Sequence, residues 1–135
     1  MTSSQESRAV VKELFDAMAV GDGQKIDALL ADDIVWDFPG NFAFSGTHVG
    51  KTAVFTDLIG AIDALYSPEG RALDVQAIIA DGHLVAAEYI GHNVGKDGKK
   101  YENLYAWFLE IADGRVRRIR TYTDTLHIHE VLSES

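Results

Sequence analysis

The chain has 135 residues, of which 47% are hydrophobic and none is cysteine, and its net charge is −9 at pH 7. This size suits a single domain over residues 1–135, and the lack of cysteine excludes disulfides, thiol catalysis and zinc–cysteine sites. The acidic charge argues against nucleic acid and anionic membranes as partners. No apolar run approaches the roughly 20 residues of a membrane span and no secretion signal is visible, so we expect no membrane partner and a cytoplasmic location.

The first third of the chain predicts two helices followed by a strand. Ser3 and Glu6 fit a capping box, after which apolar residues recur at helical spacing until Gly21. A second, short helix should follow and end at the Ala-Asp-Asp sequence of residues 31–33. The next run, IVWDF (34–38), is β-branched and aromatic and therefore predicts a strand.

The rest of the chain predicts one helix, four strands and a short final helix. Residues 41–50 are predicted to form a loop, and residues 52–66 place their apolar side chains on one helical face. The period then changes to two, and three hairpin-turn dipeptides separate four predicted strands: Asp81-Gly82, Asp97-Gly98 and Asp113-Gly114. The tail LHIHEVL (126–132) predicts a short helix.

This order indicates an α+β domain in which helices cover one face of a curved, mostly antiparallel sheet. The strand over 104–109 is apolar on both alternations, whereas a sheet that is wet on one side should alternate cleanly. A second copy of the chain is the simplest cover for the other face, so we expect a homodimer through the convex side. The alternative is a monomer whose C-terminal segment folds over that face.

Two long segments resemble the SnoaL-like, ketosteroid-isomerase-like superfamily, which has the nuclear transport factor 2-like fold. They are VKELFDAMAVGDGQKIDALLADDIVWDFPG (11–40) and GRVRRIRTYTDTLHIHEVL (114–132). The resemblance implies a cone-shaped α+β barrel, in which a strongly curved sheet wraps around the N-terminal helices and leaves a conical pocket. Members include isomerases, cyclases, dehydratases, epoxide hydrolases and non-catalytic binders, so the fold alone does not assign a chemistry.

The catalytic residues of these families are largely replaced in this chain. The three ketosteroid-isomerase positions align with apolar residues: Leu14, Phe38 and Ala106. The catalytic positions of limonene-type epoxide hydrolases align with Tyr89, Gly91 and Thr121, and the acid/base aspartate of the polyketide cyclases also aligns with Thr121. A shift of one residue near Pro39 would instead place Asp37 at the base position of the isomerases.

Asp37 is the candidate catalytic residue, because it is the one acid in an apolar strand, between Trp36 and Phe38. If Asp37 points into the cone, poor solvation would raise its pKa and suit it to act as an acid or base. In the alternative, Trp36 and Phe38 point inward and Asp37 faces solvent, because neighbouring strand residues point to opposite faces.

The segment after the last strand has two open interpretations. Asp124 either caps the final helix or lines the pocket. His127 and His129 are two residues apart, which on a helix separates them by about 200° and prevents both from binding one ion. We therefore expect surface or dimer-contact histidines and no metal site, and no motif for a nucleotide or flavin is present, so no cofactor is expected.

These observations predict that the chain binds a small, largely apolar ligand in a conical pocket. The candidate ligand-binding residues are Phe15, Trp36, Phe38, Phe55, Ile59, Tyr89, Asn103, Tyr105, Thr121 and Asp124. The activity expected first is a cofactor-independent isomerase, cyclase or dehydratase. The alternatives are a non-catalytic binding protein with the same pocket, and a dimeric interaction module whose cone is filled by its own core.

Overall fold

The computed structural model describes residues 3–133. This part of the chain forms a six-stranded sheet and several helices, which come before, between and after the strands in the sequence. The helices are α1 (Ser4–Val20), α2 (Gly23–Leu29), the π-helix η1 (Ala53–Ile59), α3 (Gly60–Asp63) and α4 (Thr125–Ser133). The strands are β1 (Leu30–Phe38), β2 (Gly46–Val49), β3 (Ala72–Asp81), β4 (Leu84–Val94), β5 (Lys100–Ala112) and β6 (Arg115–Thr123). No helix within this part of the chain is long and apolar enough to cross a membrane.

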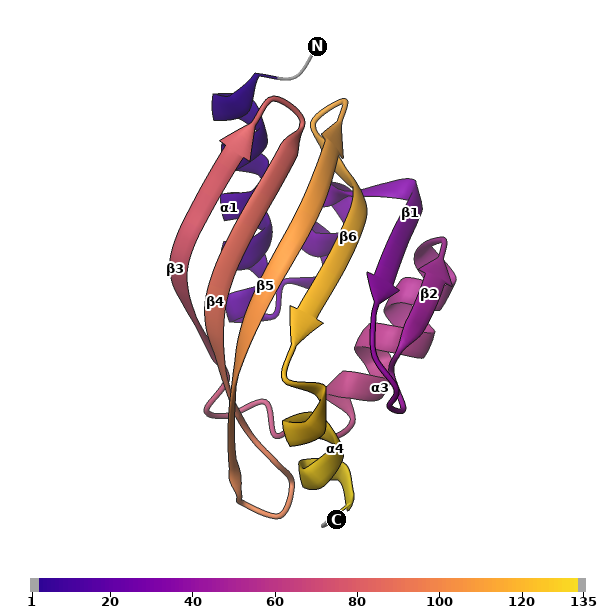
Figure 1. The fold of residues 1–135 in the computed structure, drawn as a ribbon, viewed down its shortest axis with the longest axis vertical. Coiled ribbons are helices and arrows are strands. Elements are labelled where there is room, and N and C mark those ends of the chain that lie inside the picture. Colours follow the sequence, from indigo (N-terminus) through magenta and orange to yellow (C-terminus); the bar gives the residue numbers. More distant parts are fainter. Residues whose placement is uncertain (1–2, 134–135) are drawn as a thin grey trace.

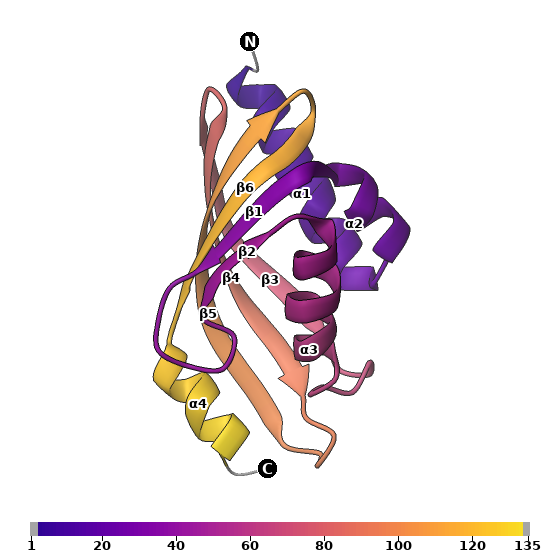
Figure 2. The ribbon, with the colours of Figure 1, turned by 90° about the vertical axis from the view of Figure 1, so that its right-hand side faces the viewer.

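The sheet has the strand order β2-β1-β6-β5-β4-β3 (Figure 1). Neighbouring strands are antiparallel except for β1 and β6, which run parallel. Helices α1, α2 and α3 lie on one face of the sheet, and α4 lies at the end where β6 stops (Figure 2). The predicted α+β class is therefore confirmed, with a sheet that is strongly curved but not closed into a barrel.

Local sequence signals explain where the first helix begins and ends. The Ser3 hydroxyl accepts a hydrogen bond from the Glu6 backbone N–H at 3.1 Å and donates to the Glu6 carboxylate at 3.0 Å, which satisfies one of the free N–H groups of α1. Gly21 ends the helix with φ 70°, a left-handed conformation that glycine adopts without steric penalty. Between these ends, α1 buries Val11 and Leu14 in the core.

The hairpin turns also follow their sequence signals. Asp113 and Gly114 both have positive φ, at 53° and 73°, as a type I′ turn requires. Gly82 and Gly98 are likewise left-handed in the turns before β4 and β5. The three predicted Asp-Gly hairpins are therefore confirmed.

The structure corrects three predicted boundaries before residue 70. Residues 31–33 belong to β1, not to the end of α2, and the expected loop 41–50 contains β2. Long-range pairing decides both, because β1 is held by β2 on one side and β6 on the other. The helix expected over 52–66 is a π-helix followed by a short α-helix, with the Gly60 N–H bonded to the Phe55 carbonyl oxygen.

The two faces of β5 differ sharply in burial. Tyr101, Trp107 and Leu109 are each at most 2% exposed on the face covered by the helices, whereas Leu104 is 64% and Phe108 37% exposed on the outer face. The core therefore sits between the concave face and the helices, and the outer face carries apolar side chains that residues 3–133 leave exposed.

Candidate functional site

A cavity of about 420 Å³ lies between the concave face of the sheet and the helices. Most of its wall is apolar, and much of that wall is aromatic. It is lined by Leu14, Met18, Gly21, Gly23, Ile26, Leu30, Trp36, Phe38, Phe44, Phe55, Ile59, Gly60, Ile62, Asp63, Tyr66, Arg71, Leu73, Tyr89, Gly91, Asn93, Tyr105, Trp107, Ile119, Thr121 and Ile128. This volume is in the range of pockets that hold small organic molecules.

Aromatic rings pack against one another along one wall of the cavity. The Trp36 and Trp107 rings meet edge to face at 5.0 Å, and the Tyr89 and Tyr105 rings are stacked at 4.8 Å. The Trp36 Nε1–H donates a buried hydrogen bond to Thr121 Oγ1 at 2.9 Å. Because each ring is held by its neighbours, the wall keeps its shape without a ligand.

The indole nitrogen of Trp107 is the one buried polar side-chain atom of residues 3–133 that lacks a hydrogen-bond partner. Burial raises the pKa of the neighbouring Tyr89 hydroxyl, so this group is protonated at neutral pH. The Trp107 N–H lies close enough to Tyr89 to oppose this rise, but it does not reach hydrogen-bonding geometry.

A hydroxyl network lies beside Tyr105, where β4 and β5 approach α4. Tyr105 Oη is 3.1 Å from Tyr101 Oη, and the Asn103 side-chain N–H donates to Tyr101 Oη at 2.7 Å. The Tyr66 ring stacks on the Tyr101 ring at 5.6 Å. Burial raises the pKa of Tyr66, Tyr101 and Tyr105 above the usual value, so at neutral pH these hydroxyls are uncharged hydrogen-bond donors.

One ion pair lies among the lining residues. The Arg71 guanidinium donates to Asp63 Oδ1 at 2.9 Å, and the Asp63 side chain is 49% exposed. Asp63 is the one carboxylate that lines the cavity in the part of the chain that the structure describes. Because about half of its side chain is exposed to solvent, Asp63 lies at the rim of the cavity, where Arg71 balances its charge.

The structure corrects the expectation for Asp37, which lies on the outer face of β1 and does not line the cavity. Its Oδ2 accepts hydrogen bonds from Arg118 Nε at 3.0 Å and Nη2 at 2.6 Å, and its Oδ1 accepts one from Thr47 Oγ1 at 2.9 Å. Burial by itself would raise the pKa of Asp37. The hydrogen bonds from Arg118 and Thr47 and the positive charge of Arg118 outweigh this effect, so the pKa lies below its usual value. The inward position that would have raised the pKa of Asp37 is therefore not adopted, and the alternative with Trp36 and Phe38 inward is confirmed.

The other predicted binding residues divide into two groups. Those brought together around the cavity are Trp36, Phe38, Phe55, Ile59, Tyr89, Tyr105 and Thr121. Phe15 and Asn103 lie behind the wall: the Phe15 ring is 5.3 Å from the Tyr89 and Trp107 rings, and Asn103 bonds to Tyr101. Phe15 therefore supports two lining rings directly, and Asn103 reaches the lining residue Tyr105 through Tyr101.

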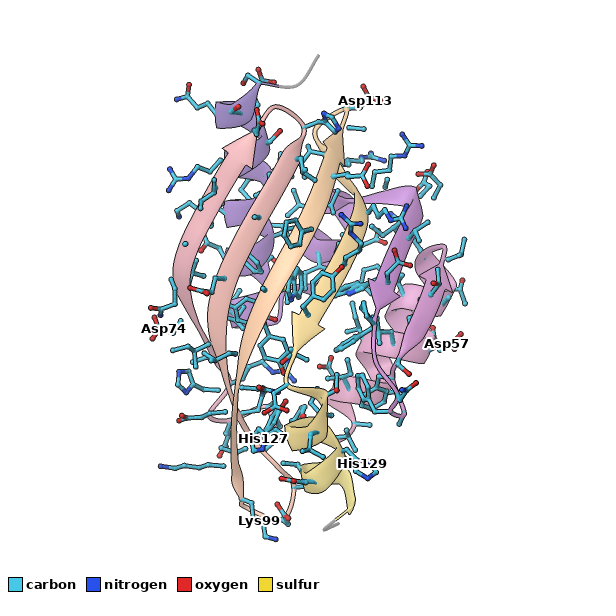
Figure 3. The ribbon with its side chains drawn as sticks, viewed as in Figure 1. Asp57, Asp74, Lys99, Asp113, His127 and His129 are labelled. Carbon is cyan, nitrogen blue, oxygen red and sulfur yellow. The ribbon has the colours of Figure 1, made fainter. Side chains whose placement is uncertain are left out.

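Asp124 and the histidines belong to α4. Asp124 Oδ1 accepts a hydrogen bond from the His127 backbone N–H at 3.0 Å, which confirms the N-cap interpretation. Figure 3 shows His127 on the side of α4 toward β5, where its ring lies 5.0 Å from that of Tyr101, and His129 on the other side. Within residues 3–133, no three His, Asp or Glu side chains gather as a metal site would require.

Several site residues escaped the sequence analysis. Tyr101 and Trp107 could have been found, because strand alternation places them on the same face of β5 as Asn103 and Tyr105. The same alternation turns Ala106 outward, although it aligns with a catalytic position of the isomerases. Asp63 and Arg71 gave no signal, since they lie in the segment between η1 and β3 and are brought to the rim by packing. Tyr66 ended the apolar face predicted over 52–66 but was not expected at the site.

Comparison with known proteins agrees with this architecture. The sequence profile of the SnoaL-like domain family matches residues 11–119. A nuclear transport factor 2-like (NTF2-like) protein from Burkholderia xenovorans LB400 is 27% identical, with a TM-score of 0.77 over 97% of this chain and 98% of that one. A protein from Jannaschia sp. CCS1 described as a SnoaL-like polyketide cyclase is 17% identical, with a TM-score of 0.79 over 98% and 94% of the two chains.

A third solved structure is an LEH-like epoxide hydrolase from M. tuberculosis, which is 22% identical, with a TM-score of 0.75 over 97% of this chain and 92% of that one. No curated protein matches the sequence. At identities below 25%, the likeness to the last two structures concerns the fold alone.

Proposed function

The chain belongs to the SnoaL-like domain family, and from the properties of its cavity we propose that it binds a small, largely apolar ring compound between the sheet and the helices. The observation that supports this most is the wall itself: an aromatic surface around about 420 Å³ in which the one carboxylate of the described residues, Asp63, lies at the rim. Flat ring systems fit such a wall, because stacked and edge-to-face contacts add to the burial of apolar area.

Binding without proton transfer is the function that this wall favours. The three positions aligned with the epoxide-hydrolase catalytic residues do line the cavity, but they hold Tyr89, Gly91 and Thr121. General acid–base catalysis needs a group that changes protonation near the working pH, and burial moves the pKa of Tyr89 away from that range. The cavity interior can therefore hold and orient a ligand but offers no base.

A cofactor-independent isomerase, cyclase or dehydratase is the second candidate, and Asp63 is the observation that favours it. Asp63 is the one lining carboxylate among residues 3–133, and it is held by Arg71 at 2.9 Å. A ligand that reaches the rim could exchange a proton with it. With a substrate in hand, Asp63→Asn should abolish turnover if this is the base, and unchanged turnover would exclude it.

A neutral dye whose emission depends on its surroundings, N-phenyl-1-naphthylamine, tests the binding function directly. The two tryptophans of the chain, Trp36 and Trp107, both line the cavity, so their emission gives a second readout. Ile59→Phe adds bulk inside the cavity, and Ile79→Phe adds the same bulk on the outer face, where Ile79 is 68% exposed. We expect Ile59→Phe to weaken binding at least tenfold and Ile79→Phe to leave it unchanged. Equal affinity in all three proteins would show that the dye does not use the cavity.

We further propose that a second copy of the chain covers the outer face of the sheet. Leu104, Phe108 and Tyr122 are 64%, 37% and 44% exposed there, and the Phe108 and Tyr122 rings meet edge to face at 6.0 Å. Contiguous exposed apolar surface of this kind is typical of interfaces. Sedimentation equilibrium at micromolar concentration should give a dimer that Leu104→Glu converts to a monomer. Val20→Glu, at the exposed end of α1, is the control, and a monomeric wild type would refute the proposal.

A further inference from the structure

The orientation of the Asn103 amide is determined by its backbone partners. Its Oδ1 accepts from the Leu104 backbone N–H at 2.9 Å, and its Nδ2 donates to the Asp124 carbonyl oxygen at 3.0 Å. A backbone N–H can only donate and a carbonyl oxygen can only accept, so the amide cannot be flipped. The remaining N–H of Asn103 therefore donates to Tyr101 Oη, 2.7 Å away.

This contact determines where the Tyr101 proton goes. Tyr101 is 2% exposed, so its hydroxyl proton needs a protein acceptor. It cannot point at Asn103, which is already donating. In the part of the chain that the structure describes, the only other partner of Tyr101 Oη is Tyr105 Oη at 3.1 Å. Tyr101 therefore donates to Tyr105.

The chain of donors ends at the cavity. Tyr105 lines the cavity and Tyr101 does not, and the Tyr105 hydroxyl has no hydrogen-bond partner other than the Tyr101 hydroxyl within residues 3–133. Since the Tyr105 oxygen accepts from Tyr101, its own O–H is free to donate a hydrogen bond to a group inside the cavity. Each donor in such a chain also polarises the next, which strengthens the last hydrogen bond.

From this geometry we infer that the Tyr105 hydroxyl forms a subsite for the neutral carbonyl oxygen of a bound ring compound, such as an aryl ketone or a quinone. The inference rests on the proposed binding function and specifies the chemistry of its ligand. A carbonyl oxygen accepts without needing to donate, which matches a hydroxyl whose own proton has no acceptor among residues 3–133.

The surroundings favour a neutral oxygen over a charged one. Among the described residues that line the cavity, Arg71 is the one cation, and Asp63 already neutralises it. A carboxylate beside Tyr105 would lose its hydration without gaining a counter-charge. An anionic ligand should therefore bind more weakly than a ketone of the same shape.

Gly91 leaves the space that the Tyr105 ring occupies. A Cβ at Gly91 would lie 2.9 Å from Tyr105 Cε2, so the ring can stack on Tyr89 at 4.8 Å only because residue 91 has no side chain. Gly91 lies within β4 and has no positive φ, so the backbone would tolerate alanine, and the tightest contact of the new Cβ would be with the Tyr105 ring. Gly91→Ala thus displaces the hydroxyl without removing it.

The test compares fluorene with 9-fluorenone, two tricyclic probes of the same shape that differ in a CH₂ group and a C=O group. The measured quantity is the ratio of their affinities, obtained by calorimetry or tryptophan quenching. We expect Tyr105→Phe to lower the fluorenone-to-fluorene ratio about five- to tenfold, as loss of one neutral hydrogen bond does, with fluorene itself unaffected. Tyr122→Phe, on the outer face, is the matched control. Gly91→Ala should lower the ratio like Tyr105→Phe.

Infrared spectroscopy detects the hydrogen bond from Tyr105 to the ligand carbonyl directly. The carbonyl stretch of bound fluorenone should shift to lower frequency in the wild type and return toward its apolar-solvent value in Tyr105→Phe. Fluorene-9-carboxylate should bind at least tenfold more weakly than fluorenone. If both tricycles bind but the ratio and the stretch are the same in wild type and Tyr105→Phe, the carbonyl subsite is refuted and the binding function stands. If neither tricycle nor the naphthylamine dye binds, the binding function is refuted and the subsite with it.

Discussion

Thr121→Val tests whether the hydrogen bond between Trp36 and Thr121 holds the cavity wall. Trp36 Nε1 donates to Thr121 Oγ1 at 2.9 Å, and the two residues are 6% and 1% exposed. Valine keeps the shape of threonine but removes the acceptor, which leaves a buried N–H unpaired at a cost of about 1–3 kcal/mol. The added methyl group returns about 0.8 kcal/mol at most. With that full offset, we therefore expect a net loss of about 1 kcal/mol, within a range of about 0.2–2.2 kcal/mol, in the free energy of unfolding.

Urea denaturation followed by circular dichroism measures this loss, and tryptophan emission reports the changed environment of Trp36. Thr123→Val is the control, because the Thr123 hydroxyl donates to the Leu104 carbonyl oxygen at 2.6 Å at an exposed site, where water can replace it. Its effect should stay within about 0.5 kcal/mol. On a Trp36→Phe background no indole N–H remains, so Thr121→Val should cost little. A Thr121→Val protein as stable as wild type, or an equal loss on both backgrounds, would refute the reasoning.

Three further changes have distinct expected outcomes. Asp37 has a lowered pKa in the folded chain, so its ion pair stabilises the fold above its unfolded pKa of 3.8, and this contribution disappears as the pH falls through the folded value. In urea titrations, Asp37→Asn should be less stable than wild type at pH 7, and the difference should shrink as the pH falls below 3.8. Asp124→Ala removes the cap of α4 and should cost about 1 kcal/mol, with faster amide exchange confined to that helix; uniform exchange would contradict this. Gly70 has a φ of 79°, and a Cβ there would lie 2.7 Å from Val94 Cγ2, whereas Gly98 has a φ of 86° and a Cβ there would lie in open space. Alanine at either position should therefore cost about 1 kcal/mol from the backbone, and Gly70→Ala should cost more. Equal melting temperatures of the two variants would show that Val94 moves aside freely.

The sequence by itself determined the features that depend on neighbouring residues. The capping box of Ser3, the hairpin at Asp113-Gly114 and the cap at Asp124 all form as predicted, because each is a hydrogen bond or a φ value set within a few residues. Strand alternation also established that Trp36 and Phe38 point one way and Asp37 the other.

Only the tertiary structure decided which of those directions is the inside. Strand alternation shows which residues share a face but not which face is buried. The buried face is the one on which the helices pack. Here the parallel pairing of β1 with β6 places Arg118 against Asp37 on the outer face and Thr121 against Trp36 on the inner one. The two contacts join residues 81 and 85 positions apart. No local rule could supply them, because the free energy that selects them comes from burying the aromatic wall as a whole.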